Sequence, residues 1–240
     1  MTRKKRKKKK RLSVAEKSRR MTARDARRAI TFDFEGRKGY RPRPDLIGVF
    51  DPFEPPHSRS YQLVLSENLR GAAKAGDGRA VGDLSVVMER LVARADANKA
   101  FLVSYSQFDR AMVEKWVGRD DPALYKRFER VYRDARARAK LWARSNDYVR
   151  LMRADEDFNL QRCLDFIGYS CRRNYRDADV SATLRLLHEH LKAGRKYMKL
   201  GKRDKRRWHD VLGHNRCDVE GTRELLLIST GAREWQPAQS

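Results

Sequence analysis

The hydrophobic residues of this chain form short runs in its first third and helical repeats beyond it. The run from Ala29 to Gly36 is rich in β-branched and aromatic residues and ends in glycine, which predicts a strand. Segments 45–51 and 61–65 have the same character, and proline-rich turns precede each of them. Three neighbouring strands with short connections predict an antiparallel meander.

Apolar residues at helical spacing dominate the rest of the chain. Segment 71–82 is rich in glycine and alanine and is interpreted as a loop. A fourth strand at 100–105 follows a helix, so it is expected to run parallel to an earlier strand, and 163–167 is a weak fifth strand. His188 and His190 are expected to be exposed. Helices are predicted over about 14–28, 83–95, 108–117, 122–144, 181–191 and 213–229.

The charge of the chain indicates a polyanionic partner. The formal net charge is +24, and residues 1–28 hold fifteen Lys and Arg residues against two acids, a surplus of 13. The remainder still carries about +11, so nucleic acid is the expected partner. No segment approaches the length of a membrane-spanning helix, and the cationic run 3–11 lacks the apolar stretch of a secretory signal.

The same features predict the domain organisation. Residues 1–28 are interpreted as a basic, largely disordered arm, 29–230 as one α/β domain, and 231–240 as a loose tail. Three cysteines at 163, 171 and 217 lack a CxxC spacing. They predict unpaired thiols in a reducing compartment, with no disulfide or zinc site. The expected location is the cytoplasm, with nucleoid association or a nuclear address as alternatives.

The helix predicted at 122–144 is densely cationic. Such a run is commonly a solvated helix face. The scarcity of acids after Asp134 favours instead a surface that faces phosphates, with Arg130 and Arg133 among its residues.

Asp33 and Glu35 lie two positions apart in the first strand, so their side chains point to the same side and those of Phe32 and Phe34 to the other. Neighbouring carboxylates repel each other and are costly to keep charged where they are partly buried. A divalent cation removes that cost, and hard oxygen ligands suit Mg²⁺ or Mn²⁺. The alternative is an edge strand with a solvated acidic face.

Two later acids are candidates to join this pair. Asp109 follows the fourth strand at a helix start, where an acid can also be a simple cap. His214 and Asp218 are four residues apart on the last helix and so share a face, which is also compatible with an ordinary surface hydrogen bond.

Taken in chain order, these segments resemble the DEDD superfamily of 3′→5′ exonucleases, which have a ribonuclease-H-like fold. The order is the strand with Asp33 and Glu35, the meander, a helix, a strand, Asp109, and a last helix with Asp218. The residue sequences of segments 105–109 and 214–222 most resemble those of predicted bacterial nucleases that are often associated with RecB-like or helicase domains. The resemblance covers about residues 29–230. It implies a mixed sheet, an antiparallel meander plus parallel strands, flanked by helices, with the Arg-rich helix as an insertion.

The resemblance implies phosphodiester hydrolysis with two Mg²⁺ or Mn²⁺ ions. Asp33 would bridge both ions, Glu35 and Asp218 would complete one site each, and Asp109 would act mostly through bound water. Two cations roughly 3.5–4 Å apart stabilise the attacking hydroxide and the departing 3′ oxygen. His214 would orient or deprotonate the attacking water, a task that suits an imidazole with a pKa of about 6.5.

The spacing of the histidine departs from the family pattern. Three residues separate His214 from Asp218, as in the tyrosine subgroup, whereas the histidine subgroup usually places four there. His209 is therefore the alternative general base.

The resulting prediction is a 3′→5′ exonuclease acting on single-stranded DNA or RNA. The alternatives are a non-catalytic nucleic-acid-binding protein of a ribonucleoprotein or virion that keeps the fold, and an endonuclease with the same metal site. Aromatic residues at 34, 40 and 105 are candidates to stack on bases, although such residues are as often core. Predicted nucleic-acid contacts are Arg37, Lys38, Tyr105, Ser106, Arg110, Arg130, Arg133 and Arg216.

Overall fold

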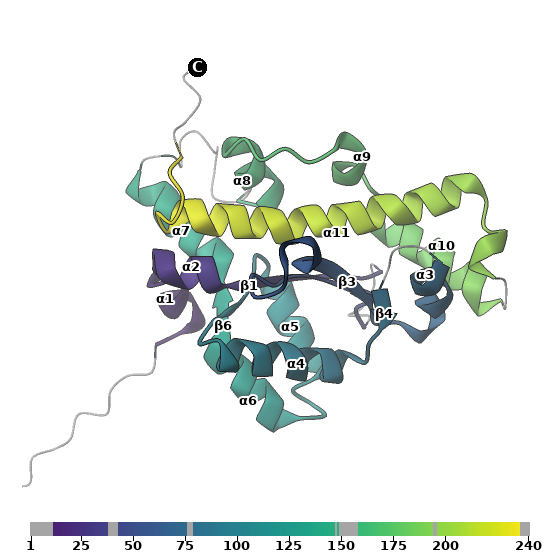
Figure 1. Cartoon of the computed structure of the whole chain (residues 1–240), viewed down its shortest axis with the longest axis horizontal. Coiled ribbons are helices and arrows are strands. Elements are labelled where there is room, and N and C mark those ends of the chain that lie inside the picture. Colours follow the sequence, from purple (N-terminus) through teal and green to yellow (C-terminus); the bar gives the residue numbers. More distant parts are fainter. Residues whose placement is uncertain are drawn as a thin grey trace, which may run out of the picture.

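A mixed six-stranded sheet forms the centre of the fold (Figure 1). The computed structural model describes residues 12–37, 43–75, 79–146, 148, 158–193 and 196–235. The strands lie in the order β4-β3-β2-β1-β5-β6. Their bounds are β1 Ile30–Glu35, β2 Leu46–Phe50, β3 Ser60–Val64, β4 Arg79–Val81, β5 Leu102–Ser104 and β6 Tyr132–Asp134.

The pairing of the strands confirms the predicted meander. β1, β2 and β3 pair antiparallel, with Asp33 opposite Gly48. β5 pairs parallel to β1, as the sequence predicted for a strand that follows a helix, and β6 continues the parallel part. The carboxyl ends of the parallel strands β1, β5 and β6 therefore lie at the same end of the sheet.

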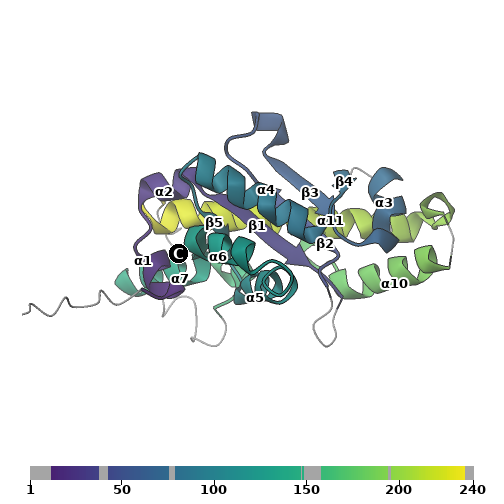
Figure 2. The same cartoon turned by 90° about the horizontal axis from the view of Figure 1, so that it is seen from below.

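Helices cover both faces of this sheet. α11 crosses one face over β1, β2 and β3, and α4, α5 and α6 lie on the other (Figures 1 and 2). The helix bounds are α1 Val14–Arg19, α2 Ala23–Arg28, α3 Arg70–Ala75, α4 Leu84–Ala97, α5 Gln107–Trp116, α6 Pro122–Val131, α7 Ala135–Ser145, α8 Leu160–Phe166, α9 Arg173–Arg176, α10 Val180–Lys192 and α11 Lys202–Ser229.

The alternation of side chains in β1 decides which face holds the carboxylates. Phe32 and Phe34 are buried in the core against α4 and α6. Thr31 and Asp33 point the other way, toward α11, where Thr31 Oγ1 donates to the carbonyl oxygen of Val219 at 2.8 Å. The predicted division of β1 into an aromatic and an acidic face is thus confirmed.

The prediction of one helix over 122–144 is wrong, because α6 ends at Val131 and a strand begins at Tyr132. Residues Tyr132–Asp134 form β6, which pairs with Leu102–Ser104 of β5. Tyr132 is buried, and its hydroxyl lies 3.0 Å from Ser104 Oγ. The Arg-rich segment is therefore not an inserted helix, since it supplies the edge strand of the sheet.

Two further local predictions are wrong. Segment 163–167 is helical, because Asn159 caps α8 by accepting from the Arg162 N–H. The predicted loop at 71–82 contains the end of α3 and the strand β4.

Residues 12–28, which were predicted to belong to the basic arm, are part of the folded domain. The single helix predicted over 14–28 is two helices, since Thr22 and Asp25 form a second capping box. Ser18 and Ala26 are completely buried, and Ser18 Oγ accepts from the N–H of Asp134 at 2.8 Å. Residues 1–11 lie outside the described residues.

The C-terminal segment is also less loose than predicted. Residues 231–235 are described, and Trp235 packs on Trp142, Tyr148 and Phe166 with ring centroids 5.1–5.5 Å away. Residues 236–240 lie outside the described part. Within the described part, no helix combines the length and the apolar character that crossing a membrane requires.

Candidate active site

Four acids from three elements meet in one open cleft of about 450 Å³. β1 contributes Asp33 and Glu35, the first turn of α5 contributes Asp109, and α11 contributes Asp218. They meet because β1 and β5 finish at the same end of the sheet, and because α11 crosses the acidic face of β1. The cleft is lined by Asp33, Phe34, Glu35, Gly36, Arg37, Ser106, Phe108, Asp109, His214 and Asp218.

Asp109 is the most buried of the four acids, with no exposed surface. Its Oδ1 accepts from the Phe34 N–H at 3.1 Å, which fixes the first turn of α5 to the end of β1. Its Oδ2 is buried and has no hydrogen-bond partner among the described residues. Burial raises the pKa of Asp109 to about 7, against the opposing effect of the Phe34 N–H. An unpartnered carboxylate oxygen in this position suits a cation.

Asp33 is held by Asn215 of α11. Asn215 Nδ2 donates to Asp33 Oδ2 at 3.0 Å and lies 3.3 Å from the carbonyl oxygen of Asp33. This approach requires Gly48 on β2, because a β-carbon there would overlap the Asn215 amide. Burial, followed by the charges of the neighbouring acids, raises the pKa of Asp33 well above its ordinary value, and the bond from Asn215 opposes that shift.

Glu35, Asp218 and His214 form the part of the cleft most suited to an ion. One ligand atom of each lies within 4.8 Å of the others, and no other such cluster of His, Cys, Asp and Glu side chains occurs in the described residues. His214 Nε2 is 3.6 Å from Glu35 Oε1 and 3.5 Å from Asp218 Oδ2. Burial raises the pKa of Glu35 and of Asp218; the Asp218 charge adds to the shift of Glu35, whereas His214 opposes that of Asp218.

The ring of His214 is oriented from behind by α9. Its Nδ1 donates to the carbonyl oxygen of Tyr175 at 2.8 Å, and a carbonyl can only accept. The proton of the neutral ring is therefore on Nδ1, and the lone pair of Nε2 faces the carboxylates. Gly213 allows this contact, since a β-carbon there would collide with the Tyr175 ring.

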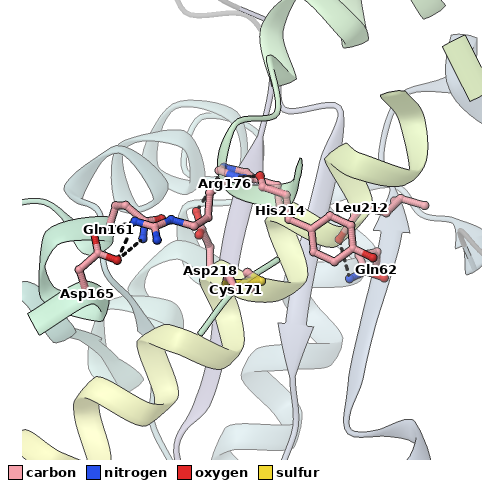
Figure 3. The surroundings of a disulfide bond; sticks show 10 residues. Gln62, Gln161, Asp165, Cys171, Arg176, Leu212, His214 and Asp218 are labelled. Carbon is pink, nitrogen blue, oxygen red and sulfur yellow. Dashed lines mark hydrogen bonds and ion pairs between the residues drawn. A yellow bond between two sulfur atoms is a disulfide. The ribbon is translucent and has the colours of Figure 1, made fainter. Parts of the chain in front are cut away.

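A disulfide ties the same segment to α11. Cys171, just before α9, pairs with Cys217, which precedes Asp218 directly, and the Cα atoms are 6.2 Å apart (Figure 3). The prediction of three unpaired thiols is therefore wrong for this pair and correct for Cys163, which is free and buried. Cysteine spacing failed here because the two residues, 46 positions apart, meet only when α9 folds back on α11.

The donor set of the cleft suits a hard divalent cation. Its oxygens come from Asp33, Glu35, Asp109 and Asp218, and His214 adds one imidazole nitrogen. Four acids held this close, with raised pKa values, repel each other, and bound cations would relieve that repulsion.

Only some of the predicted nucleic-acid contacts lie at the cleft. Arg37 and Ser106 line the cleft, and Arg216 is exposed on α11. Arg110 pairs with Glu129 at 2.6 Å outside the cleft, and the exposed Arg130 lies beyond its lining. Lys38 lies outside the described residues, as does the stacking candidate Tyr40.

Other predicted contacts are used in the protein interior. The guanidinium of Arg133 stacks on Phe101, 3.9 Å from the ring centroid. Tyr105 is buried and donates to the carbonyl oxygen of Phe158 at 3.0 Å, and Phe34 is buried in the core, so neither offers a face to a base. His209, the alternative general base, is exposed and does not line the cleft.

Sequence reasoning missed one aromatic residue of the cleft. Phe108 is 49% exposed at the rim, next to Asp109, whereas the aromatic candidates chosen from the sequence are core residues or lie outside the described part. Its position in the first turn of α5 was a usable signal, because the residue before a buried helical acid points to a different side.

His188 is buried, whereas the sequence predicted an exposed side chain. It is 6% exposed, and its Nε2 lies 2.7 Å from Asp45 Oδ1. Asp45 in turn accepts from Arg37 Nε at 3.1 Å, so this buried pair anchors an arginine of the cleft. His190 is partly buried, with Nε2 lacking a partner among the described residues.

No family model, curated protein or solved structure matches this chain.

Proposed function

We propose that this protein is a divalent-metal-dependent 3′→5′ exonuclease that hydrolyses single-stranded DNA or RNA. The observation that carries the proposal is the convergence of Asp33, Glu35, Asp109 and Asp218 on one cleft together with His214. These residues are spread over 186 positions of the chain, and their meeting in one cleft of a chain with net charge +24 suits chemistry on a phosphodiester.

The order of elements supports a ribonuclease-H-like fold of the DEDD type. The chain runs through an antiparallel meander, a helix and a strand parallel to β1, then an acid in the first turn of α5. The last acid, Asp218, lies on α11, which crosses the sheet face that carries the first two.

Two Mg²⁺ or Mn²⁺ ions are the cofactors that the donor set fits. Asp33, Glu35, Asp109 and Asp218 would hold them. When bound, such a pair stabilises the charge of the attacking hydroxide and of the departing 3′ oxygen.

The protein's own groups would divide the remaining work. His214 Nε2, unprotonated in the neutral ring, would accept a proton from the attacking water. Arg37, anchored to Asp45, would contact the scissile phosphate from the rim of the cleft. The exposed ring of Phe108 would stack on a base.

One gel tests the proposal. Single strands of DNA and RNA, labelled at the 3′ or the 5′ end, are incubated with Mg²⁺, Mn²⁺ or chelator. We expect metal-dependent release of labelled mononucleotide from the 3′ end and a ladder from the 5′-labelled strand. Internal fragments without a ladder would indicate an endonuclease.

Two variants control the gel. Asp33→Asn removes one cleft carboxylate and should abolish hydrolysis while leaving binding nearly intact. Glu189→Gln, exposed on α10, removes one charge outside the cleft and should cleave like the parent. If no strand is cut with either ion, the nuclease proposal is wrong, and a non-catalytic nucleic-acid-binding role is favoured.

A further inference from the structure

Two more cavities lie beside the carboxylate cleft, along the contact of α1 with α7 and β6. The first, of about 480 Å³, lies among α1, α5, α6 and β6, and the second, of about 390 Å³, lies between α1 and α7. Both are lined by Ala15, Gln107 and Asp134, so the two cavities adjoin each other. We call the second cavity the α1–α7 groove.

The α1–α7 groove is strongly cationic. Arg19 of α1 and three residues of α7, Arg136, Lys140 and Arg144, line it, against a single acid, Asp134. Asp134 is buried, and its Oδ1 accepts from the Ala137 N–H at 3.1 Å as the cap of α7. This oxygen is thus engaged in the helix cap, and the lining of the groove carries four cationic side chains against one acid.

The groove is connected to the cleft through the start of α5. Gln107 lines the groove, while Ser106 and Phe108, its two neighbours, line the carboxylate cleft. Gln107 and Phe108 are both exposed. A strand with one phosphate at the carboxylates can therefore pass over this turn and continue beside α7.

We propose that the α1–α7 groove binds the phosphodiester backbone of the single strand on the 5′ side of the scissile bond. The direction rests on the proposed function, since a 3′→5′ exonuclease holds the 3′ end in its cleft and the rest of the strand leaves on the 5′ side. Phosphates are the ligand that four clustered Lys and Arg side chains fit, and contacts to the backbone suit an enzyme that must accept every base.

The sequence places further positive charge next to this region. Leu12 lines the first cavity, and the nine consecutive Lys and Arg residues 3–11 precede it directly in the chain. In the chain, this run of positive charge therefore directly precedes a residue of the cavity next to the α1–α7 groove.

The test compares two triple variants with the same charge change. The groove variant is Arg19→Gln, Lys140→Gln and Arg144→Gln; Arg136 is kept because its Nε donates to the carbonyl oxygen of Phe158. The control is Lys202→Gln, Arg203→Gln and Arg206→Gln, three exposed residues at the start of α11 that line neither the cleft nor the groove.

Binding of a fluorescent single strand of about twenty nucleotides is measured by anisotropy in chelator over a range of salt. Loss of three phosphate contacts should reduce the slope of log affinity against log salt by about 2, and the control should keep the parent slope. Equal slopes for the two variants would overturn the proposal. If the groove triple unfolds, Arg144→Gln alone, on the exposed last turn of α7, should reduce the slope by about 0.7, and an unchanged slope would overturn it equally.

This experiment does not depend on hydrolysis, because the chelator prevents it. If the parent cleaves but the two triple variants have equal slopes, only the assignment of the groove is refuted. A protein that shows the slope difference but never cleaves would refute the exonuclease and retain the groove as a nucleic-acid-binding surface.

Discussion

Replacing Asp109 by asparagine should stabilise the metal-free protein near and above neutral pH. The carboxyl of Asp109 is fully buried, one of its oxygens has no partner among the described residues, and burial raises its pKa to about 7. An unfolded aspartate has a pKa of 3.8. The folded protein therefore keeps this proton over a pH range in which the unfolded chain has already lost it.

The sign of the effect follows from this difference in bound protons. Below a pH of about 4, both states are protonated and Asp109 has no effect of this kind on stability. As the pH rises from about 4 to about 7, the unfolded state is favoured increasingly, and above about 7 the penalty is constant. A difference of about three pKa units corresponds to roughly 4 kcal/mol.

The assay is urea unfolding followed by tryptophan fluorescence in chelator, from about pH 4.5 to about pH 8.5. The free energy of unfolding of Asp109→Asn, relative to that of the parent, should increase by up to roughly 4 kcal/mol as the pH rises across this range. Glu189→Gln should follow the parent profile. Mg²⁺ at about 100 times its Kd should raise the free energy of unfolding of the parent by about 2.7 kcal/mol, and that of Asp109→Asn by little. A difference between Asp109→Asn and the parent that does not vary with pH would refute the reasoning.

Two further perturbations test the supports of the site, and a third tests the N-terminal charge. Gly48→Ala should lower the free energy of unfolding by about 1–3 kcal/mol, because the new methyl group displaces the Asn215 amide from Asp33. It should also lower the rate of hydrolysis. Thermal unfolding measures the first effect, and the end-labelled gel measures the second. Cys171→Ser should lower stability by up to about 4 kcal/mol, since the disulfide closes a loop of 46 residues, and should slow hydrolysis through the loosened α9 behind His214. Deleting residues 1–11 should flatten the salt dependence of binding, by up to about 6 in slope for nine cations, and should preserve the fold and hydrolysis.

Each of these tests has its own control. Gly71→Ala places a methyl group 3.8 Å from Leu191, an ordinary contact, so it should be tolerated. A dithiol reductant should reproduce the Cys171→Ser effect in the parent and have no effect on the variant; an unaffected parent would contradict a role of the disulfide. Deleting residues 1–20 instead removes α1 and the bond from Asp134 to Ser18, and this longer deletion should destabilise the protein.

The part of the site that the sequence determined depends on local periodicity. Strand alternation placed Asp33 and Glu35 on one face of β1, and the helical repeat placed His214 and Asp218 on one face of α11. The meander, the parallel strand β5 and the acid in the first turn of α5 were readable for the same reason, since turns, caps and apolar spacing act over a few residues.

Only the tertiary structure decided which distant groups support these acids. The Asn215 amide reaches Asp33 because α11 lies directly on Gly48, and the Tyr175 carbonyl reaches His214 because α9 folds back on that helix. The break at Tyr132 is likewise tertiary: 122–144 has a helical pattern, but pairing with β5 and burial of the tyrosine outweigh local helix propensity there. Such contacts depend on how elements cross in space, and the spacing of residues along the chain carries no record of that crossing.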